Sequence, residues 1–363
     1  PETPDGHDAR RYLEPLLAEG PGAYVENDNA ALWVARVGAA VLPLSVNAPH
    51  PDNGYVVSPY AHYFAYGGEE LRRIGQPLRR AACRAALAPL AAAFRATRFD
   101  EVVYVNNWLL STNLYPALSA AEVGALHAAL VETFPDRALV FRSVDARGNP
   151  ALLAALTRLG YAPVFSRQVY YQDVGEPGFW SRKQLKVDAA LRRRTPYRLL
   201  NHDQISPEAA ARLRRLYEQL YLEKHSRHNP RFTEAFLRRA LTHRLLHVQA
   251  FARDGRIDAV LGYCRSNGVM TQPLFGYDTQ LPQALGLYRL LSLQVLHAAR
   301  QNGCLVNASA GVGPFKRLRG GVAALEYNAV YVGHLPCAQR PRGRALRAVL
   351  DRVGVPLIRR GGF

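Results

Sequence analysis

The fold is decided by residues 276–321, which read GYDTQLPQALGLYRLLSLQVLHAARQNGCLVNASAGVGPFKRLRGG. Apolar residues recur every three or four positions over 285–303, which predicts a helix that Gly303 ends. The run CLVNASA at 304–310 predicts a buried strand. Glycines then lead into FKRLRG at 315–320, a basic segment too short for an ordinary surface helix. The predicted order is helix, strand and short basic turn.

The region before this stretch predicts a pair of helices and a meander of three strands. The dipeptides Asp-Gly at 254–255 and Asn-Gly at 267–268 are strong hairpin signals between alternating apolar runs. Helical periodicity precedes the meander, and one more apolar strand follows the short basic turn. The predicted elements are helices at 206–226 and 231–245 and strands at 246–255, 256–268, 269–278 and 323–332.

The first half of the chain alternates strands and helices, which is typical of an α/β architecture. Ser119 is a good N-cap before one helix, and Gly160 ends another. A stretch rich in glycine, proline and basic residues, 175–199, marks the joint between the halves. The predicted elements are a two-strand meander at 31–47, helices at 69–97, 119–135 and 150–161, and strands at 101–107, 138–144 and 163–174.

The net charge of +17 is concentrated in two blocks. Residues 182–244 hold 16 Lys and Arg against six Asp and Glu, and residues 312–363 hold ten against two. Residues 1–181 are slightly acidic, with 15 against 18, and 245–311 are nearly balanced. A segregated positive field favours a polyanionic partner such as RNA, a nucleotide or a phosphorylated carrier, although solvated surface would explain it equally well.

Several protein classes are excluded or disfavoured by what the sequence lacks. No apolar run approaches ~18 residues, so no membrane span is expected, and the N-terminal residues do not read as a signal peptide. P-loop, G-x-G-x-x-G and G-x-S-x-G motifs are absent, which disfavours ATP, NAD and hydrolase chemistry. The four cysteines lack metal-ligand spacing, so we expect free thiols in a cytoplasmic protein and no metal site. They are Cys83, Cys264, Cys304 and Cys337.

The order of elements in the second half resembles the GNAT acyltransferase fold. Residues 276–321 are similar to the FemAB-like branch of that superfamily, where two GNAT-like domains stand in tandem. The pair Phe315-Lys316 followed by Gly320 matches the Phe-Lys-Arg…Gly signature of the branch. The resemblance covers residues 195–336, and it extends to 1–175 only through the pattern of strands and helices.

This resemblance implies an α/β fold of two tandem GNAT-like domains, each a mixed, largely antiparallel sheet flanked by helices. The expected domains are 1–180 and 181–336, followed by a basic tail helix at 337–363. In GNAT enzymes a Q/R-x-x-G-x-G/A loop holds the coenzyme A pyrophosphate at a helix N-terminus. The stretch 283–288 keeps the Gln and the middle Gly, but Tyr288 replaces the last Gly. A tyrosine there would intrude on the phosphate, which weakens the coenzyme A interpretation.

The resemblance suggests where acyl transfer would occur. By analogy, Lys316 would neutralise the tetrahedral intermediate or the 3′ end of tRNA; a solvated cation is the alternative. Asp278 could accept the amine proton, or it could simply cap a turn. Asn307 and Ser309 share one strand face, where they could meet substrate or satisfy backbone at a bulge. The candidates are Lys316, Asp278, Tyr277 and Asn307 for catalysis, and Tyr288, Ser309, Phe315 and Glu326 for substrate contact.

Two further clusters are candidates for substrate binding. KHSRHNPRF, 224–232, lies between the two helices, where GNAT folds usually build the acceptor site; Asn229-Pro230 also reads as a simple helix stop. VNNWLLSTNLYP, 105–116, crowds amides and aromatics after a buried strand, and a loop packed by its own tryptophan is the alternative. The candidates are Lys224, His225 and Asn229 from the first cluster and Asn106, Asn107, Trp108, Ser111, Asn113 and Tyr115 from the second.

The leading hypothesis is an acyltransferase that moves an aminoacyl group from aminoacyl-tRNA to an amine of a peptide-like or small-molecule acceptor, without a cofactor. The alternatives are a coenzyme A or phosphopantetheine thioester as donor, and a non-catalytic RNA-binding protein on a degenerate fold. A monomer is compatible with the sequence. The expected nucleic-acid contacts are Arg192, Arg193, Arg194, Arg227, Arg231, Arg317, Arg319, Arg342 and Arg344.

Overall fold

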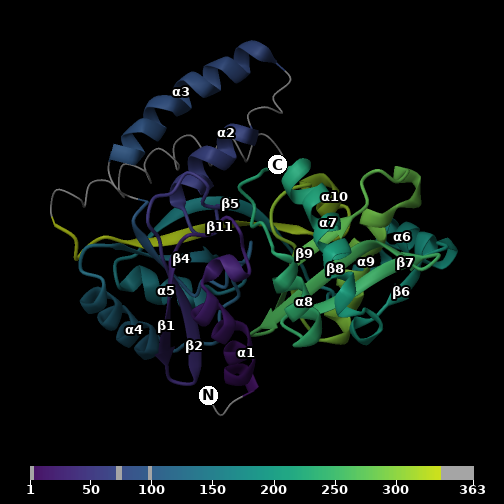
Figure 1. Cartoon of the computed structure of the whole chain (residues 1–363), viewed down its shortest axis with the longest axis horizontal. Helices are drawn as coiled ribbons and strands as arrows, with labels where there is room; N and C mark the ends of the chain where they lie inside the picture. Colours follow the sequence, from purple (N-terminus) through teal and green to yellow (C-terminus); the bar gives the residue numbers. More distant parts are fainter. Residues whose placement is uncertain (1–3, 71–75, 97–99, 337–363) are drawn as a thin grey trace.

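A computed structural model describes residues 4–70, 76–96 and 100–336 of the chain. Their strands form one continuous eleven-stranded sheet in the order β1-β2-β3-β4-β11-β5-β10-β9-β8-β7-β6 (Figure 1). The strands are β1 (Ala31–Val37), β2 (Ala40–Val46), β3 (Val102–Val105), β4 (Ala138–Val144), β5 (Ala162–Gln172), β6 (Arg198–Leu200), β7 (His247–Arg253), β8 (Arg256–Ser266), β9 (Val269–Tyr277), β10 (Leu305–Asn307) and β11 (Val322–Tyr331).

The two halves of the chain exchange their last strands. Each half contains one parallel pair, β3 with β4 and β9 with β10. The last strand of the first half, β5, pairs with β10, and the last strand of the second half, β11, pairs with β4. β5 and β11 then pair with each other along their whole length at the middle of the sheet. The two predicted sheets are therefore joined into one, and the halves are held together by backbone hydrogen bonds.

Helices cover both faces of the sheet. In the second half, α7 (Ala210–Glu218) and α8 (Glu234–Thr242) pack on one face, where α1 (Pro4–Glu19) of the first half joins their core. The helices α6 (Lys183–Arg194) and α9 (Leu287–Gln301) pack on the other face. In the first half, α4 (Ala120–Thr133) and α5 (Pro150–Arg158) share a core with β2, β3 and β4. The remaining helices are α2 (Tyr66–Glu70), α3 (Pro77–Ala96) and α10 (Gly313–Arg317). Figure 1 shows α6 and α9 near the outer end of the second half.

Local sequence signals account for most element boundaries. Asp254-Gly255 and Asn267-Gly268 have positive φ at both residues, as the tight hairpin turns that join β7 to β8 and β8 to β9 require. Ser119 caps α4 through a complete capping box with Glu122. These turns and caps confirm the predicted meander and the predicted helix start.

Two elements differ from the prediction. The strand expected over 304–310 ends at Asn307, because Lys316 binds the carbonyl oxygens of the next residues. The joint at 175–199 contains a full helix, α6, whose Leu185 and Asp188 are buried against the rest of the second half. The predicted tail helix lies outside the described residues, as do Cys83's side chain and Cys337, whereas Cys264 and Cys304 are free thiols. None of the described helices has the length and apolar character needed to cross a bilayer.

Candidate active site

β9 and β10 part after a short parallel contact. Residues 269–271 pair with 305–307, after which β10 ends and β9 continues to Tyr277. Pro273 lies just past the contact, where a missing N–H removes no hydrogen bond to β10, and a bulge interrupts the pairing with β8 at the same level. Within the described part of the chain, the side-chain oxygen of Gln272 is buried without a hydrogen-bond partner. β9 and β10 therefore diverge beyond Asn307, and this divergence is called the opening below.

Lys316 forms one wall of this opening. Its buried Nζ donates to the carbonyl oxygens of Ala308 at 2.6 Å, Ser309 at 3.0 Å and Ala310 at 2.7 Å. An ammonium group has three protons, so these bonds use them all. Burial, and then the charge of Arg167, lower the pKa of Lys316 to about 7, while the three carbonyl oxygens favour the charged form. In this arrangement Lys316 shapes the loop after β10 and has no proton left for an oxyanion.

Asn307 and Ser309 form hydrogen bonds within the same loop. The side-chain oxygen of Asn307 accepts the Ser309 N–H at 2.9 Å, and its amide donates to the Tyr171 hydroxyl at 3.0 Å. Ser309 has a φ of 58°, a left-handed conformation that is uncommon for serine, and Ser143 has the same φ at the end of β4. Asn307 therefore serves to hydrogen-bond the backbone of this loop, as the alternative interpretation had it. Its side chain stabilises the turn at Ser309.

Aromatic rings line the opening next to the start of α9. Tyr288 makes edge-to-face contacts with Phe315 at 4.9 Å, Phe275 at 5.4 Å and Tyr277 at 6.1 Å between ring centroids. Burial, and then Tyr277, raise the pKa of Tyr288 to about 12, so it stays a neutral phenol at physiological pH. The structure thus brings the predicted residues Tyr277, Tyr288 and Phe315 together as one apolar cluster.

Asp278 is not placed to act as a base. Its carboxylate accepts hydrogen bonds from Arg212 at 2.9 Å and Arg256 at 2.5 Å, and the Gln280 N–H also donates to it. Burial opposes ionisation, but these hydrogen bonds and the two guanidinium charges lower the pKa of Asp278. The turn-capping alternative is the better description, because a carboxylate paired with two arginines is a poor proton acceptor.

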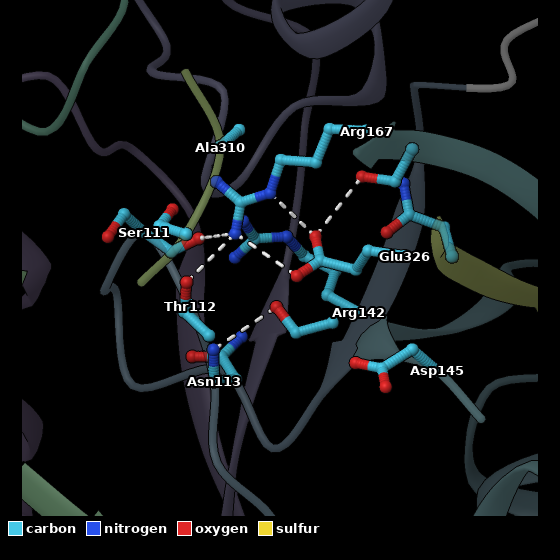
Figure 2. Close-up of polar contacts among 12 residues, drawn as sticks. Ser111, Thr112, Asn113, Arg142, Asp145, Arg167, Ala310 and Glu326 are labelled. Carbon is cyan, nitrogen blue, oxygen red and sulfur yellow. Dashed lines mark hydrogen bonds and ion pairs between the residues drawn. The ribbon is translucent and has the colours of Figure 1, made fainter. Parts of the chain in front are cut away.

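The network around Arg167 is the strongest polar feature at the centre of the sheet. Arg167 on β5 lies opposite Glu326 on β11 and binds its two oxygens at 2.7 and 3.2 Å. Its Nη2 also donates to the Ser111 carbonyl at 2.7 Å and the Thr112 hydroxyl at 2.9 Å. Figure 2 shows the third nitrogen, Nη1, directed toward Ala310 with no bond to the residues drawn. The rest of the guanidinium is fixed by these bonds, so Nη1 of Arg167 is a hydrogen-bond donor in a fixed position.

The surroundings of Arg167 keep it charged. Burial alone would lower the pKa of Arg167, but Glu326 and the nearby Tyr55 and Tyr66 raise it above the ordinary value. Arg167 in turn lies close enough to Tyr221 to lower that pKa, against a larger raising effect of burial. These tyrosines come from both halves of the chain, so Arg167 stands in an aromatic surrounding at the junction of the halves. Glu326, a predicted substrate contact, serves here to position Arg167.

The polar groups of the first-half loop 105–116 are hydrogen-bonded to one another and to neighbouring segments of the first half. Asn107 donates to the Ser45 hydroxyl and the Val56 carbonyl, and Arg142 donates to the Asn107 oxygen at 3.2 Å. The other predicted residues hold the same loop. The Asn106 oxygen accepts from the indole of Trp108, and the Asn113 oxygen accepts from the Trp108 N–H. The Asn113 N–H donates to the Ser143 hydroxyl, and the Tyr115 hydroxyl donates to the Arg142 carbonyl. The packed-loop alternative describes these residues, and the loop reaches the Arg167 network through the Ser111 carbonyl and the Thr112 hydroxyl.

The cluster 224–232 is mostly a structural turn. Asn229 donates to the carbonyls of Tyr221 and Ser226, and its own carbonyl accepts from Asn27. Lys224 is exposed and His225 half-buried, and both have interaction partners within the chain. The helix-stop interpretation therefore fits Asn229. No cluster of His, Cys, Asp or Glu suited to a metal ion occurs among the described residues.

Some of the arginines predicted to contact nucleic acid have partners inside the protein, and others are exposed to solvent. Arg319 is buried, with hydrogen bonds of 2.6 and 3.2 Å to Asp188 and its guanidinium 3.5 Å above the Phe315 ring, so it is not a phosphate contact. Arg227 pairs with Glu69. Half-buried Arg192 lies over Phe251, exposed Arg317 donates to Tyr170, and Arg231 is half-buried. Arg193 and Arg194 are exposed, and Arg342 and Arg344 lie outside the described residues.

The N-terminus of α9 is covered by α6. Gly286 caps α9 with a φ of 65°, and a Cβ built on it would lie 2.5 Å from a methyl carbon of Leu191. Further along the same contact, Asp188 of α6 pairs with Arg289 of α9 at 2.6 Å. Leu191 thus packs against Gly286 at the helix end that would bind a diphosphate, and Tyr288 stands at the second position of that helix.

Comparison with known proteins identifies this half of the chain. Residues 181–317 match the family model described as the acetyltransferase (GNAT) domain. This part of the chain is similar to GNAT domains. The match supports an acyltransferase, and the mixed sheet between helices confirms the predicted fold class. No curated protein sequence matches the chain.

Solved structures extend the fold similarity beyond the GNAT domain. The C-terminal domain of a putative lysylphosphatidylglycerol synthetase from Agrobacterium fabrum is similar over 95% of this chain and 96% of that one, with a TM-score of 0.51 and 12% identity. L-PGS from Bacillus licheniformis matches 63% of this chain and 77% of its own, with a TM-score of 0.44 and 15% identity. FemX matches 58% and 77%, with a TM-score of 0.45 and 8% identity. The first of these shows that the fold of both halves together is shared.

Two functional elements were missed by sequence reasoning. Arg167 is a charged residue in the middle of the apolar run APVFSRQVYY, and this interruption is the signal that could have found it. The helix α6 was interpreted as a joint, although Leu185, Asp188 and Leu191 recur at helical spacing within it. Both elements flank the parted strands.

Proposed function

We propose that the protein forms an amide bond by transferring an aminoacyl group from aminoacyl-tRNA to an amine acceptor in the cytoplasm. The observation that carries this proposal is the covered N-terminus of α9. A coenzyme A donor needs that helix end for its diphosphate. Here Leu191 takes the space next to Gly286, which favours a donor without a diphosphate arm.

The charge distribution supports an RNA donor. A ribose ester at the 3′ end of tRNA carries its acyl group on a chain of single phosphates, which exposed cations can follow. The α6 helix that covers the coenzyme A position also bears exposed lysines and arginines next to the opening. The fold shared with the lysylphosphatidylglycerol synthetase domain agrees with an aminoacyl donor but does not by itself identify one.

The reaction forms one C–N bond and breaks one C–O bond. The neutral amine attacks the ester carbonyl carbon, the carbonyl oxygen takes the electron pair, and the pair returns as the ribose oxygen leaves. Overall one proton passes from the amine to the ribose oxygen. We assign the developing oxyanion to Nη1 of Arg167, because preorganised cationic donors stabilise such charge most effectively. Lys316 holds the loop that the acyl group passes.

An RNase comparison tests the donor. The protein is incubated with purified charged tRNA, coenzyme A thioesters and a pool of amines, with and without RNase, and amides are detected by mass spectrometry. We expect products that require intact tRNA. Products that survive RNase would overturn the tRNA donor in favour of a thioester. A non-catalytic RNA-binding protein would bind tRNA without forming any amide.

A further inference from the structure

The exposed side of α6 is a stripe of cations without internal partners. Lys183, Lys186, Arg193 and Arg194 are exposed and make no ion pair or side-chain hydrogen bond within the part of the chain that the structure describes. At 3.6 residues per turn they fall within an arc of about 120°. Leu185 and Asp188, on the opposite side, are buried. The helix therefore has one buried side and one exposed side on which cations predominate.

The neighbouring cations of the same basic block are already neutralised. In the helix pair α7–α8 and the turn between them, six arginines each pair with a carboxylate. The cations of the α6 stripe belong to the same basic block, 182–244, but they are not neutralised in this way. The neutralised arginines are Arg212, Arg214, Arg215, Arg227, Arg238 and Arg239.

One end of the stripe lies near the N-terminus of α9. α6 runs antiparallel to α9, because Leu191 meets Gly286 at one end and Trp180, just before α6, stacks on His297 at the other. Arg193 and Arg194 thus lie near the start of α9, where Tyr288 and Phe315 flank the opening. At the far end, exposed Arg300 lies 5.3 Å above the Trp180 ring and extends the positive surface.

We propose that this α6 stripe is the docking surface for the phosphate backbone of the tRNA 3′ strand. The inference rests on the proposed function and specifies where its donor binds. Twelve helical residues span about 18 Å, which corresponds to about five nucleotides at ~3.4 Å each. Arg193 and Arg194 would contact the phosphates nearest the acyl ester, and Lys186 and Lys183 those farther away.

A membrane surface is a poorer fit for the same helix. Helices that lie on membranes insert an exposed apolar side between lipid headgroups. The apolar side of α6 is packed against the GNAT core, and Val187 is the only large apolar side chain that is exposed within this helix. A single valine among four cations fits a nucleic-acid backbone better than a bilayer.

Salt-dependent binding tests the stripe. Uncharged total tRNA is titrated in a filter-binding assay across a salt series against the wild type and K183Q/K186Q/R193Q/R194Q. Each lost phosphate contact reduces the slope of log affinity against log salt by about 0.7, so we expect a reduction of about 3 and a loss on the order of 10²–10³-fold at 0.1 M salt. An unchanged slope would overturn the proposal.

A matched variant separates the stripe from net charge. R10Q/R11Q/R215Q/R238Q also removes four exposed cations, but each of these pairs with a carboxylate in the protein. We expect this control to keep the wild-type slope; an equal loss in both variants would refute the stripe as a specific surface. If the stripe variant lost binding to phosphatidylglycerol vesicles but kept binding to tRNA, the stripe would be assigned to a membrane surface instead.

The stripe and the proposed function fail in different ways. RNase-sensitive amide formation with an unchanged tRNA slope in the stripe variant would leave the function standing and remove the docking surface. RNase-resistant amide formation would remove the function, whatever the filter assay shows. Circular dichroism of both quadruple variants confirms that they are folded, since all eight substituted side chains are exposed.

Discussion

Asp188 joins α6 to the rest of the GNAT domain, and its removal is the sharpest test of this packing. The carboxylate has no solvent exposure and accepts hydrogen bonds from Arg319 at 2.6 and 3.2 Å and from Arg289 at 2.6 Å. Arg319 is itself 5% exposed, whereas Arg289 is 34% exposed. In Asp188→Asn the shape is kept, but Arg319 stays charged and buried without a counter-ion.

The expected loss follows from these exposures. Breaking a buried ion pair by removing one partner costs about 3–5 kcal/mol, because the remaining charge stays desolvated. Arg289 adds little, since it can turn to water, as in exposed pairs worth about 0.2–1 kcal/mol. With a urea m-value of about 3 kcal/mol/M, the unfolding midpoint should fall by about 1–1.7 M.

Urea denaturation followed by circular dichroism measures the loss, with two comparison variants. Glu234→Gln breaks the exposed pair with Arg238 and should cost less than about 1 kcal/mol. D188L/R319M replaces the buried pair by apolar side chains and should recover most of the stability, because no charge is left buried. A loss below about 1 kcal/mol in D188N, or an equal loss in the double variant, would refute the reasoning.

Three further predictions concern the opening and its walls. Arg167→Gln should slow amide formation by about 10²–10³-fold with tRNA affinity unchanged; an unchanged rate in a transfer assay would remove the oxyanion role. Burial lowers the pKa of Lys316 from 10.5 to about 7, so between these values the unfolded chain binds more protons and wild-type stability should rise with pH. Lys316→Met should lack this rise in urea titrations at pH 6.5 and 9.5, and an identical pH dependence would contradict it. Gly286→Ala should cost about 1–3 kcal/mol through its positive φ and the clash with Leu191; a neutral result in thermal unfolding would show that α6 does not press on α9.

Local signals were sufficient to predict most of the sheet. Asp254-Gly255 and Asn267-Gly268 encode tight turns through residues that tolerate positive φ, so the meander could be predicted from dipeptides and alternation alone. The exchange of β5 and β11 could not, because strand pairing between distant segments leaves no local pattern. Glu326 lies opposite Arg167 only as a result of that exchange.

The candidate site was predicted in position but less well in role. Tyr277, Tyr288 and Phe315 do gather at one place, as the resemblance to the GNAT fold implied, and Lys316 follows Phe315 in the chain. Their roles depend on partners that the sequence does not show. Lys316 donates hydrogen bonds to three carbonyl oxygens, and Asp278 accepts hydrogen bonds from two arginines. Such pairing is a property of the tertiary structure, so a polar residue in a promising segment predicts a location better than a function.

The two halves share a strand plan, but the segments that follow their parallel strands are held differently. In the first half the parallel strands β3 and β4 also part, but the loop 105–116 fills the space and Asn107 bonds to Arg142, Ser45 and Val56. In the second half the equivalent strands are parted by Pro273 and by the loop that Lys316 holds. Under the proposed function, a donor on the α6–α9 face would leave the opposite face for the acceptor, where Arg167 stands among tyrosines of both halves. The first half would then enclose the acceptor and orient Arg167, and the exchange of β5 and β11 between the halves would fix that arrangement.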